Sequence, residues 1–131
     1  MIYKVYRLAT IICTPFIIFY LHRRKKIGKE DDKRINERFG LSTISRPPGR
    51  LIWLHAASVG EAISALELIN RLLTEHQDTR LMMTTGTVSS AKLIRDRLPK
   101  GAFHQFIPID MTNYVRRFME HWQPNIVLWT E

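Results

Sequence analysis

The segment LIWLHAASVGEA, residues 51–62, decides the fold because it joins a buried strand to the start of a helix. Residues 51–57 form an apolar run broken only by His55, without the two-residue alternation of a strand that faces water on one side. Such runs are typical of strands buried on both faces of a parallel sheet. Small residues then lead to Glu61, after which apolar residues recur at helical spacing. The segment therefore predicts a strand, a short loop and a helix.

Strand-like and helix-like segments continue to alternate up to Glu131. We expect strands at residues 51–57, 80–87, 103–109 and 125–131, and helices at residues 61–76, 88–98 and 110–122, the last capped by Asp110. Alternation at this spacing predicts an α/β fold with a Rossmann-like parallel sheet and right-handed crossovers. Ligands of such sheets bind at the carboxyl ends of the strands, so the residues there are the candidates for a site.

The residues at these strand ends include a carboxylate, hydroxyls and glycines. Glu61 has two interpretations: it stabilises the start of a helix through the helix dipole, or it removes a proton from the hydroxyl of a substrate that approaches over Gly60. Ser58 either caps that helix or binds substrate. Thr85 and Gly86, at the next strand end, either line a cleft or form a turn.

The remaining histidine, cysteine and tryptophan side chains favour structural roles. His55 and His104 lie within predicted strands, where a histidine is most often buried and hydrogen-bonded. The histidines and Cys13 show no metal-ligand spacing, so we expect no metal site. The tryptophans are expected in the core or as anchors: Trp53, Trp122 and Trp129.

The N-terminal residues predict a membrane anchor over residues 1–22. Residues 8–21 are apolar apart from two threonines, and the basic segment HRRKK (22–26) follows them. A bilayer core requires roughly 20 apolar residues, so both a tilted span and a helix lying in one leaflet are open. The apolar run ends in bulky residues rather than at a small-residue cleavage site, which favours a retained anchor over a signal peptide. The downstream cations predict that the domain is cytoplasmic.

The excess positive charge lies outside the predicted domain. The formal net charge is +8, and residues 1–50 hold twelve Lys and Arg against four Asp and Glu, whereas residues 51–131 hold eight of each sign. A nucleic-acid-binding domain would carry its basic patch on the folded unit, so this class is excluded. Residues 23–50 form a basic juxtamembrane segment and linker, with a short polar helix at 29–39 that Gly40 ends.

Several motifs in this chain resemble the N-terminal half of the 3-deoxy-D-manno-octulosonic acid (Kdo) transferases. The motifs, in the family's order, are R-x-x-E-R-x-G (34–40), HAASVGE (55–61), TTGT (84–87), LP…H…PID (98–110) and PNIVLWTE (124–131). The resemblance implies a two-domain GT-B glycosyltransferase anchored to the cell inner membrane, of which residues 51–131 form the truncated, acceptor-side domain. It also implies transfer of Kdo from CMP-Kdo to a lipid A precursor in lipopolysaccharide biosynthesis, without a metal or other cofactor.

The resemblance also assigns roles to individual residues. It implies that Glu61 is the general base and Glu131 a transition-state stabiliser. From their positions at the strand ends, the candidate substrate-binding residues are Ser58, Gly60, Thr85 and Gly86. The donor-binding C-terminal domain is not in this sequence, so we expect this chain to be inactive alone and to require that half, for which a separately encoded partner is one source. The alternative is a catalytically inactive, membrane-tethered relic or binding half-domain.

Overall fold

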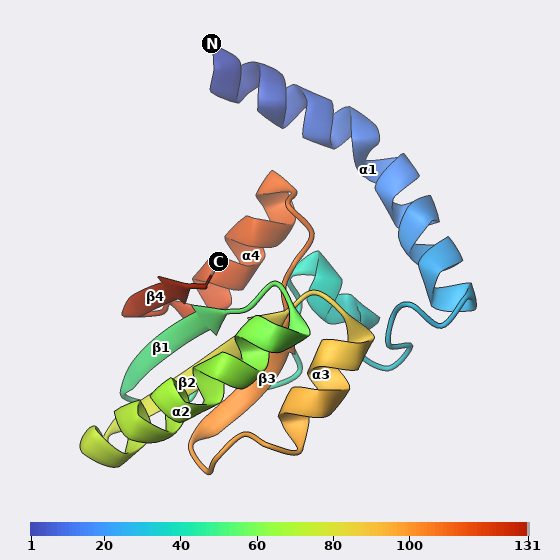
Figure 1. Ribbon diagram of the computed structural model, residues 1–131. Helices are drawn as coiled ribbons and strands as arrows, with labels where there is room; N and C mark the ends of the chain where they lie inside the picture. The colour runs from blue at the N-terminus through green and yellow to red at the C-terminus, as the bar shows by residue number, and fades with distance from the viewer. Residues whose placement is uncertain (131) are drawn as a thin grey trace.

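The computed structural model describes residues 1–130 (Figure 1). Its elements, in chain order, are α1 (Ile2–Lys26), the 3₁₀ helix η1 (Ile35–Phe39), β1 (Arg50–His55), α2 (Val59–Glu75), β2 (Thr79–Thr85), α3 (Val88–Arg95), β3 (Ala102–Phe106), α4 (Thr112–Trp122) and β4 (Ile126–Trp129). The predicted alternation of strands and helices after residue 50 is therefore present. The apolar helix predicted at the N-terminus is also present, and it continues into the basic segment.

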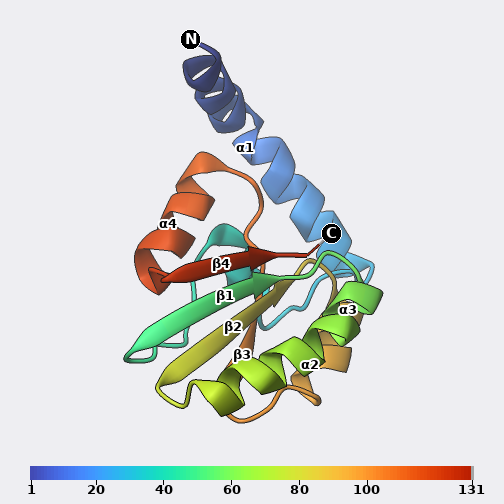
Figure 2. The same ribbon diagram turned by 60° about the vertical axis from the view of Figure 1, so that its left-hand side comes forward.

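The four strands form one parallel sheet in the order β3-β2-β1-β4. The predicted α/β class with a Rossmann-like sheet is thus confirmed. Helices α2 and α3 lie on one face of the sheet, and α4 lies on the other (Figures 1 and 2). The chain therefore adds β2 and β3 on one side of β1, and then returns through α4 to place β4 on the opposite side.

Alternate residues of β1 pack into two separate hydrophobic layers. Ile52 and Leu54 contact the side chains of α2 and α3, whereas Leu51 and Trp53 contact α4 through residues such as Phe118. A strand with apolar residues on both faces reads as the continuous run that the sequence shows. These two layers hold the carboxyl end of β1 in the middle of the molecule.

The polar helix predicted at residues 29–39 is wrong in extent, since only Ile35–Phe39 is helical and it is a 3₁₀ helix. The Asp31 side chain accepts a hydrogen bond from the Lys33 backbone N–H at 2.9 Å, and this local turn competes with helix formation. Gly40 does end the segment, with φ of 73°. A side chain on Gly40 would collide with the Tyr114 carbonyl, so only glycine fits.

Two predicted boundaries near the end of β3 are also wrong. Asp110 does not cap α4, because a tight turn from Ile109 to Met111 makes Met111 the N-cap residue, without a side-chain hydrogen bond. The strand β3 ends at Phe106 rather than at residue 109. Beyond that point the backbone pairs with Arg38, whose carbonyl accepts the Ile109 N–H at 2.9 Å.

Candidate functional site at the carboxyl edge of the sheet

The carboxyl ends of β1 and β4 meet where the order of strands reverses. In open α/β sheets the crevice at this point is the usual ligand site. Thr130, directly after β4, donates its backbone N–H to the carbonyl of His55 at 3.1 Å. Its hydroxyl lies 2.9 Å from the same carbonyl and 3.3 Å from Oε2 of Glu61. Glu61 therefore lies at the reversal point, whereas Glu131 is outside the described residues.

Glu61 is held by the first turn of α2. Its backbone N–H donates to the hydroxyl of Ser58 at 3.2 Å, and its Oε2 accepts the Ala57 backbone N–H at 2.8 Å. This reciprocal arrangement resembles a capping box. Two hydrogen-bonding groups lower the pKa of the Glu61 carboxyl because they favour its charged form. The Ala57 N–H has the larger effect and the Ser58 hydroxyl the next largest. The carboxylate is consequently ionised at neutral pH and fixed in direction.

Gly60 leaves open space beside this carboxylate. A Cβ built on Gly60 meets no atom of residues 1–130 within 4 Å, apart from its own helix backbone and neighbours. Packing within the described chain therefore does not require glycine here, although glycine weakens a helix relative to alanine. The first turn of α2 is therefore open at Gly60, and substrate contact there stays a prediction.

A hydrogen-bonded group of aromatic side chains lies at the carboxyl end of β1, just before the turn that leads to Glu61. The Thr84 hydroxyl accepts the Trp53 indole N–H at 2.8 Å and lies 2.9 Å from Nδ1 of His55. Because the indole can only donate, the Thr84 hydroxyl proton is available to His55 Nδ1. Burial lowers the pKa of His55, so the ring is neutral. The expectation that His55 is a buried, hydrogen-bonded histidine is confirmed.

Trp129 differs from the other tryptophans, since its side chain is 57% exposed. It packs on the His55 ring, with centroids 4.2 Å apart, rather than filling the core. The reason is that β4 is an edge strand whose outer side chains lie on the surface. Sequence reasoning did not identify Thr84 as the link between these rings. The available signal was a pair of threonines, Thr84 and Thr85, directly after the apolar residues of β2.

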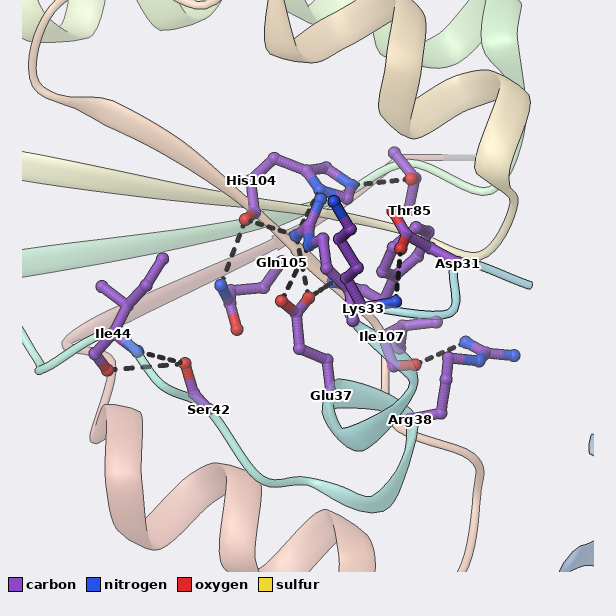
Figure 3. A network of polar contacts seen from close by, with 12 residues as sticks. Asp31, Lys33, Glu37, Arg38, Ser42, Ile44, Thr85, His104, Gln105 and Ile107 are labelled. Carbon is purple, nitrogen blue, oxygen red and sulfur yellow. Dashed lines mark hydrogen bonds and ion pairs between the residues drawn. The ribbon is translucent and has the colours of Figure 1, made fainter. Parts of the chain in front are cut away.

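Thr85 and Gly86 lie at the adjacent strand end but play different parts. The Thr85 side chain is buried and its hydroxyl lies 2.8 Å from Nε2 of His104 (Figure 3). Nδ1 of His104 lies 3.0 Å from Nη2 of Arg34, which can only donate. His104 Nε2 therefore carries the proton and donates it to Thr85. Gly86 lines a cavity between α1 and the sheet edge.

His104 is locked in its neutral form. Burial, with the nearby Arg34 charge as a second cause, lowers the pKa of His104 to about 3. A histidine with this pKa does not exchange protons at neutral pH, so its role is to orient neighbouring groups. Substrate contacts by Ser58, Thr85 and Gly86 stay predictions, and in this structure the Thr85 hydroxyl faces His104.

The ion pair between Arg34 and Glu37 covers the free edge of β3 (Figure 3). Arg34 Nη2 donates to the His104 carbonyl at 2.9 Å, and Glu37 Oε2 accepts the Phe106 N–H at 2.7 Å. In a parallel sheet, one residue of a neighbouring strand would satisfy these same two groups. The Arg34–Glu37 pair thus takes the place of a neighbouring strand. Arg38 contacts the backbone just beyond β3, and we call Arg34, Glu37 and Arg38 together the edge clamp.

The described residues contain no group of three or more His, Cys, Asp or Glu side chains arranged to hold a metal ion. At one edge of the sheet, the site contains the ionised carboxylate of Glu61, the accessible backbone of Gly60 and the N-terminus of α2. This arrangement defines an α/β domain with a candidate ligand site at the reversal point of its sheet.

The chain belongs to the Kdo transferase family. The family model described as 3-deoxy-D-manno-octulosonic-acid transferase (kdotransferase) matches residues 33–131. A probable mitochondrial 3-deoxy-D-manno-octulosonic acid transferase of Arabidopsis thaliana is 39% identical over 127 residues, which are 97% of this chain and 28% of that protein. The 3-deoxy-D-manno-octulosonic acid transferase of Rickettsia bellii is 35% identical over 98% of this chain and 31% of its own length.

A more distant relative is the 3-deoxy-D-manno-octulosonic acid transferase of Haemophilus influenzae, which is 28% identical over 94% of this chain and 29% of its own length. The chain thus spans less than a third of the length of these curated relatives. No solved structure gives a significant match to it.

Proposed function

We propose that this chain forms the acceptor-side part of an enzyme that transfers Kdo from CMP-Kdo to a hydroxyl of a lipid A precursor. Membership of the Kdo transferase family supports the reaction class. The observation that carries the proposal within this chain is the Glu61 carboxylate, ionised and oriented at the reversal point of the sheet. Donor binding is assigned to a C-terminal domain, which can be encoded separately.

The proposed chemical step is a displacement at the anomeric carbon of Kdo. The acceptor hydroxyl gives its proton to Glu61 as its oxygen bonds to the anomeric carbon, and the bond from that carbon to the phosphate oxygen breaks to release CMP. A lowered pKa keeps Glu61 deprotonated but also makes it a weaker base. Proton transfer therefore accompanies formation of the new bond, when the hydroxyl becomes acidic. The step itself uses no cofactor.

The other site residues have supporting roles in this proposal. Glu131 stabilises the transition state from the end of β4. Gly60 lets the acceptor approach the first turn of α2, where no described side chain obstructs it. Ser58 orients Glu61 through its hydroxyl and contacts the acceptor, and Thr85 and Gly86 border the site at the next strand end.

The proposed location is the cytoplasmic side of the inner membrane, in lipopolysaccharide biosynthesis. Helix α1 is long and apolar enough to cross a membrane by length and composition. The basic residues in its last turn, from Arg23 to Lys26, support attachment with the domain on the cytoplasmic side. The lipid A precursor then reaches the site from the membrane.

The test is transfer of labelled Kdo in membranes that contain this chain and a Kdo transferase C-terminal half, with CMP-Kdo and lipid A precursor added. We expect the chain with Glu61 to support transfer. The transfer rate of Glu61→Gln should be lower by at least about a hundredfold, which is the usual contribution of a general base. Glutamine is a matched control for folding, because it also serves in a capping box. If Glu61→Gln is as active as the unsubstituted chain, Glu61 is not the general base. If no mixture shows activity, the result favours the alternative of a catalytically inactive half-domain.

A further inference from the structure

Helix α1 turns one face toward the domain, and Leu21 is the residue of this face that is fully buried. Its half-buried and buried positions recur at helical spacing: Thr10, Thr14, Ile17, Leu21 and Arg24. Nearer the N-terminus, the Tyr6 hydroxyl donates to the Asp110 carbonyl at 3.3 Å. The stretch from Tyr6 to Arg24 corresponds to about 27 Å of helix. The domain therefore lies alongside α1, rather than below one end of it.

The opposite face of α1 is apolar and exposed. Its residues are Val5, Leu8, Ile12, Phe16 and Phe19, each at least 60% exposed. On the domain side, by contrast, Thr10, Thr14 and Ile17 are half-buried. Pro15 lies inside the helix, and Figure 1 shows the axis of α1 changing direction along its length. An exposed apolar stripe of this length is unfavourable in water and favours contact with lipid.

The domain residues that border α1 include two arginines. Arg117 lines a cavity with Thr10 and Thr14, and Arg116 lines another with Tyr3 and Tyr6. If α1 crossed the membrane along its normal, these guanidinium groups would enter the hydrocarbon layer, which is about 30 Å thick. A charged side chain in that layer costs several kcal/mol. The geometry of this chain therefore disfavours a perpendicular span.

The angle between α1 and the domain is fixed by a buried carboxylate. Glu30, whose side chain is 2% exposed, contacts Arg24 Nε of α1 at 2.7 Å and Arg38 Nε of the edge clamp at 3.5 Å. The Arg38 guanidinium also donates to the Ile107 carbonyl beyond β3. One carboxylate thus joins the end of α1 to the sheet through two charged groups.

We propose that α1 lies along the membrane surface in one leaflet, with its stripe from Val5 to Phe19 in the acyl chains. The occupant of this face is the lipid of an anionic leaflet. The charges support this choice, because cations flank the stripe at both ends: Lys4, Arg7, Arg23, Lys25, Lys26 and Lys29. In this orientation both groups of cations reach head groups of the same leaflet.

This orientation places the sheet's carboxyl edge at the membrane surface. Ile17, Tyr20 and Leu21 of α1 line a cavity together with Gly86 and Thr87, which follow β2. An acceptor hydroxyl in the head-group layer then lies on the side of the molecule that carries Glu61. The inference rests on the proposed membrane attachment and is independent of the proposed transfer.

The first test is the accessibility of the N-terminus in inside-out inner-membrane vesicles that contain the full chain. In a Cys13→Ser background, Ile2→Cys and the surface control Glu120→Cys are treated with a membrane-impermeant maleimide. We expect both to react without detergent. If Ile2→Cys reacts only after detergent while Glu120→Cys reacts before it, the helix crosses the membrane and the proposal is wrong.

The second test measures depth with fluorophores on Ile12→Cys and Phe19→Cys, quenched by brominated lipids in phosphatidylglycerol-containing vesicles. A surface helix places both probes at the same depth, whereas a perpendicular span separates them by about 10 Å. Failure of the chain to bind these vesicles also overturns the proposal. Neither test requires turnover, so a failure of the proposed transfer leaves these results interpretable.

Discussion

The edge clamp gives the most quantitative test of the structure, through Glu37→Ala. The Glu37 and Arg34 side chains are 10% and 21% exposed, and Glu37 accepts bonds from both the guanidinium and the Phe106 N–H. Replacing Glu37 with alanine leaves the mostly buried Arg34 guanidinium and the Phe106 N–H without the carboxylate that accepts from both. Breaking a buried pair costs about 3–5 kcal/mol. We take the low end, about 3 kcal/mol, because Arg34 retains its bond to the His104 carbonyl.

The assays are urea unfolding and thermal unfolding of the full chain in detergent, both followed by circular dichroism. A loss of about 3 kcal/mol corresponds to a melting temperature lower by about 12 °C, with about 4 °C per kcal/mol for a chain of this size. Glu37→Gln is the control, since it keeps an acceptor for Phe106 and should cost less. A double-mutant cycle with Arg34→Met should give a coupling of at least about 1 kcal/mol. A cost below about 1 kcal/mol for Glu37→Ala would refute the strand-substitute interpretation.

Three further predictions concern the site. Ser58→Ala should destabilise the chain by about 1 kcal/mol through loss of the α2 cap, and an unchanged urea midpoint would contradict the capping geometry. Gly60→Ala should raise stability by up to about 1 kcal/mol yet lower Kdo transfer; full activity would show that no ligand uses this space. Because the folded-state pKa of His104 is lowered to about 3, its contribution to stability is complete above its ordinary pKa and declines as pH falls from about 6.5 toward 3. In His104→Gln, the free energy of unfolding should therefore fall less steeply between about pH 6.5 and pH 3. An unchanged slope would show that His104 is not held neutral in the folded chain.

The sheet and its order of elements could be predicted from sequence because burial on both faces leaves a strong local signature. The run at residues 51–57 and the helical spacing after Glu61 are both local patterns. The cap formed by Ser58 is local as well, and it was among the alternatives. These features depend on residues within a few positions of one another, so no knowledge of the tertiary structure was needed.

The contacts that the sequence did not reveal are long-range. Arg34 and Glu37 meet His104 and Phe106 across about 70 residues, and no pattern within either segment indicates the pairing. The predicted Asp110 cap failed because the tight turn at Met111 moved the helix start by one position. Trp129 was exposed because β4 lies at an edge, which depends on strand order rather than on its own sequence.

The separation between the edge clamp and its partners also sets an order of events during synthesis. Helix α1 and the clamp leave the ribosome about 70 residues before β3, which corresponds to roughly 4–14 s at 5–20 residues per second. During that interval the apolar helix has no domain to pack against, and the guanidinium and carboxylate of the clamp have only each other and water. If α1 attaches to the membrane as proposed, the nascent chain reaches the membrane first and folds its sheet there, starting from an attached N-terminus.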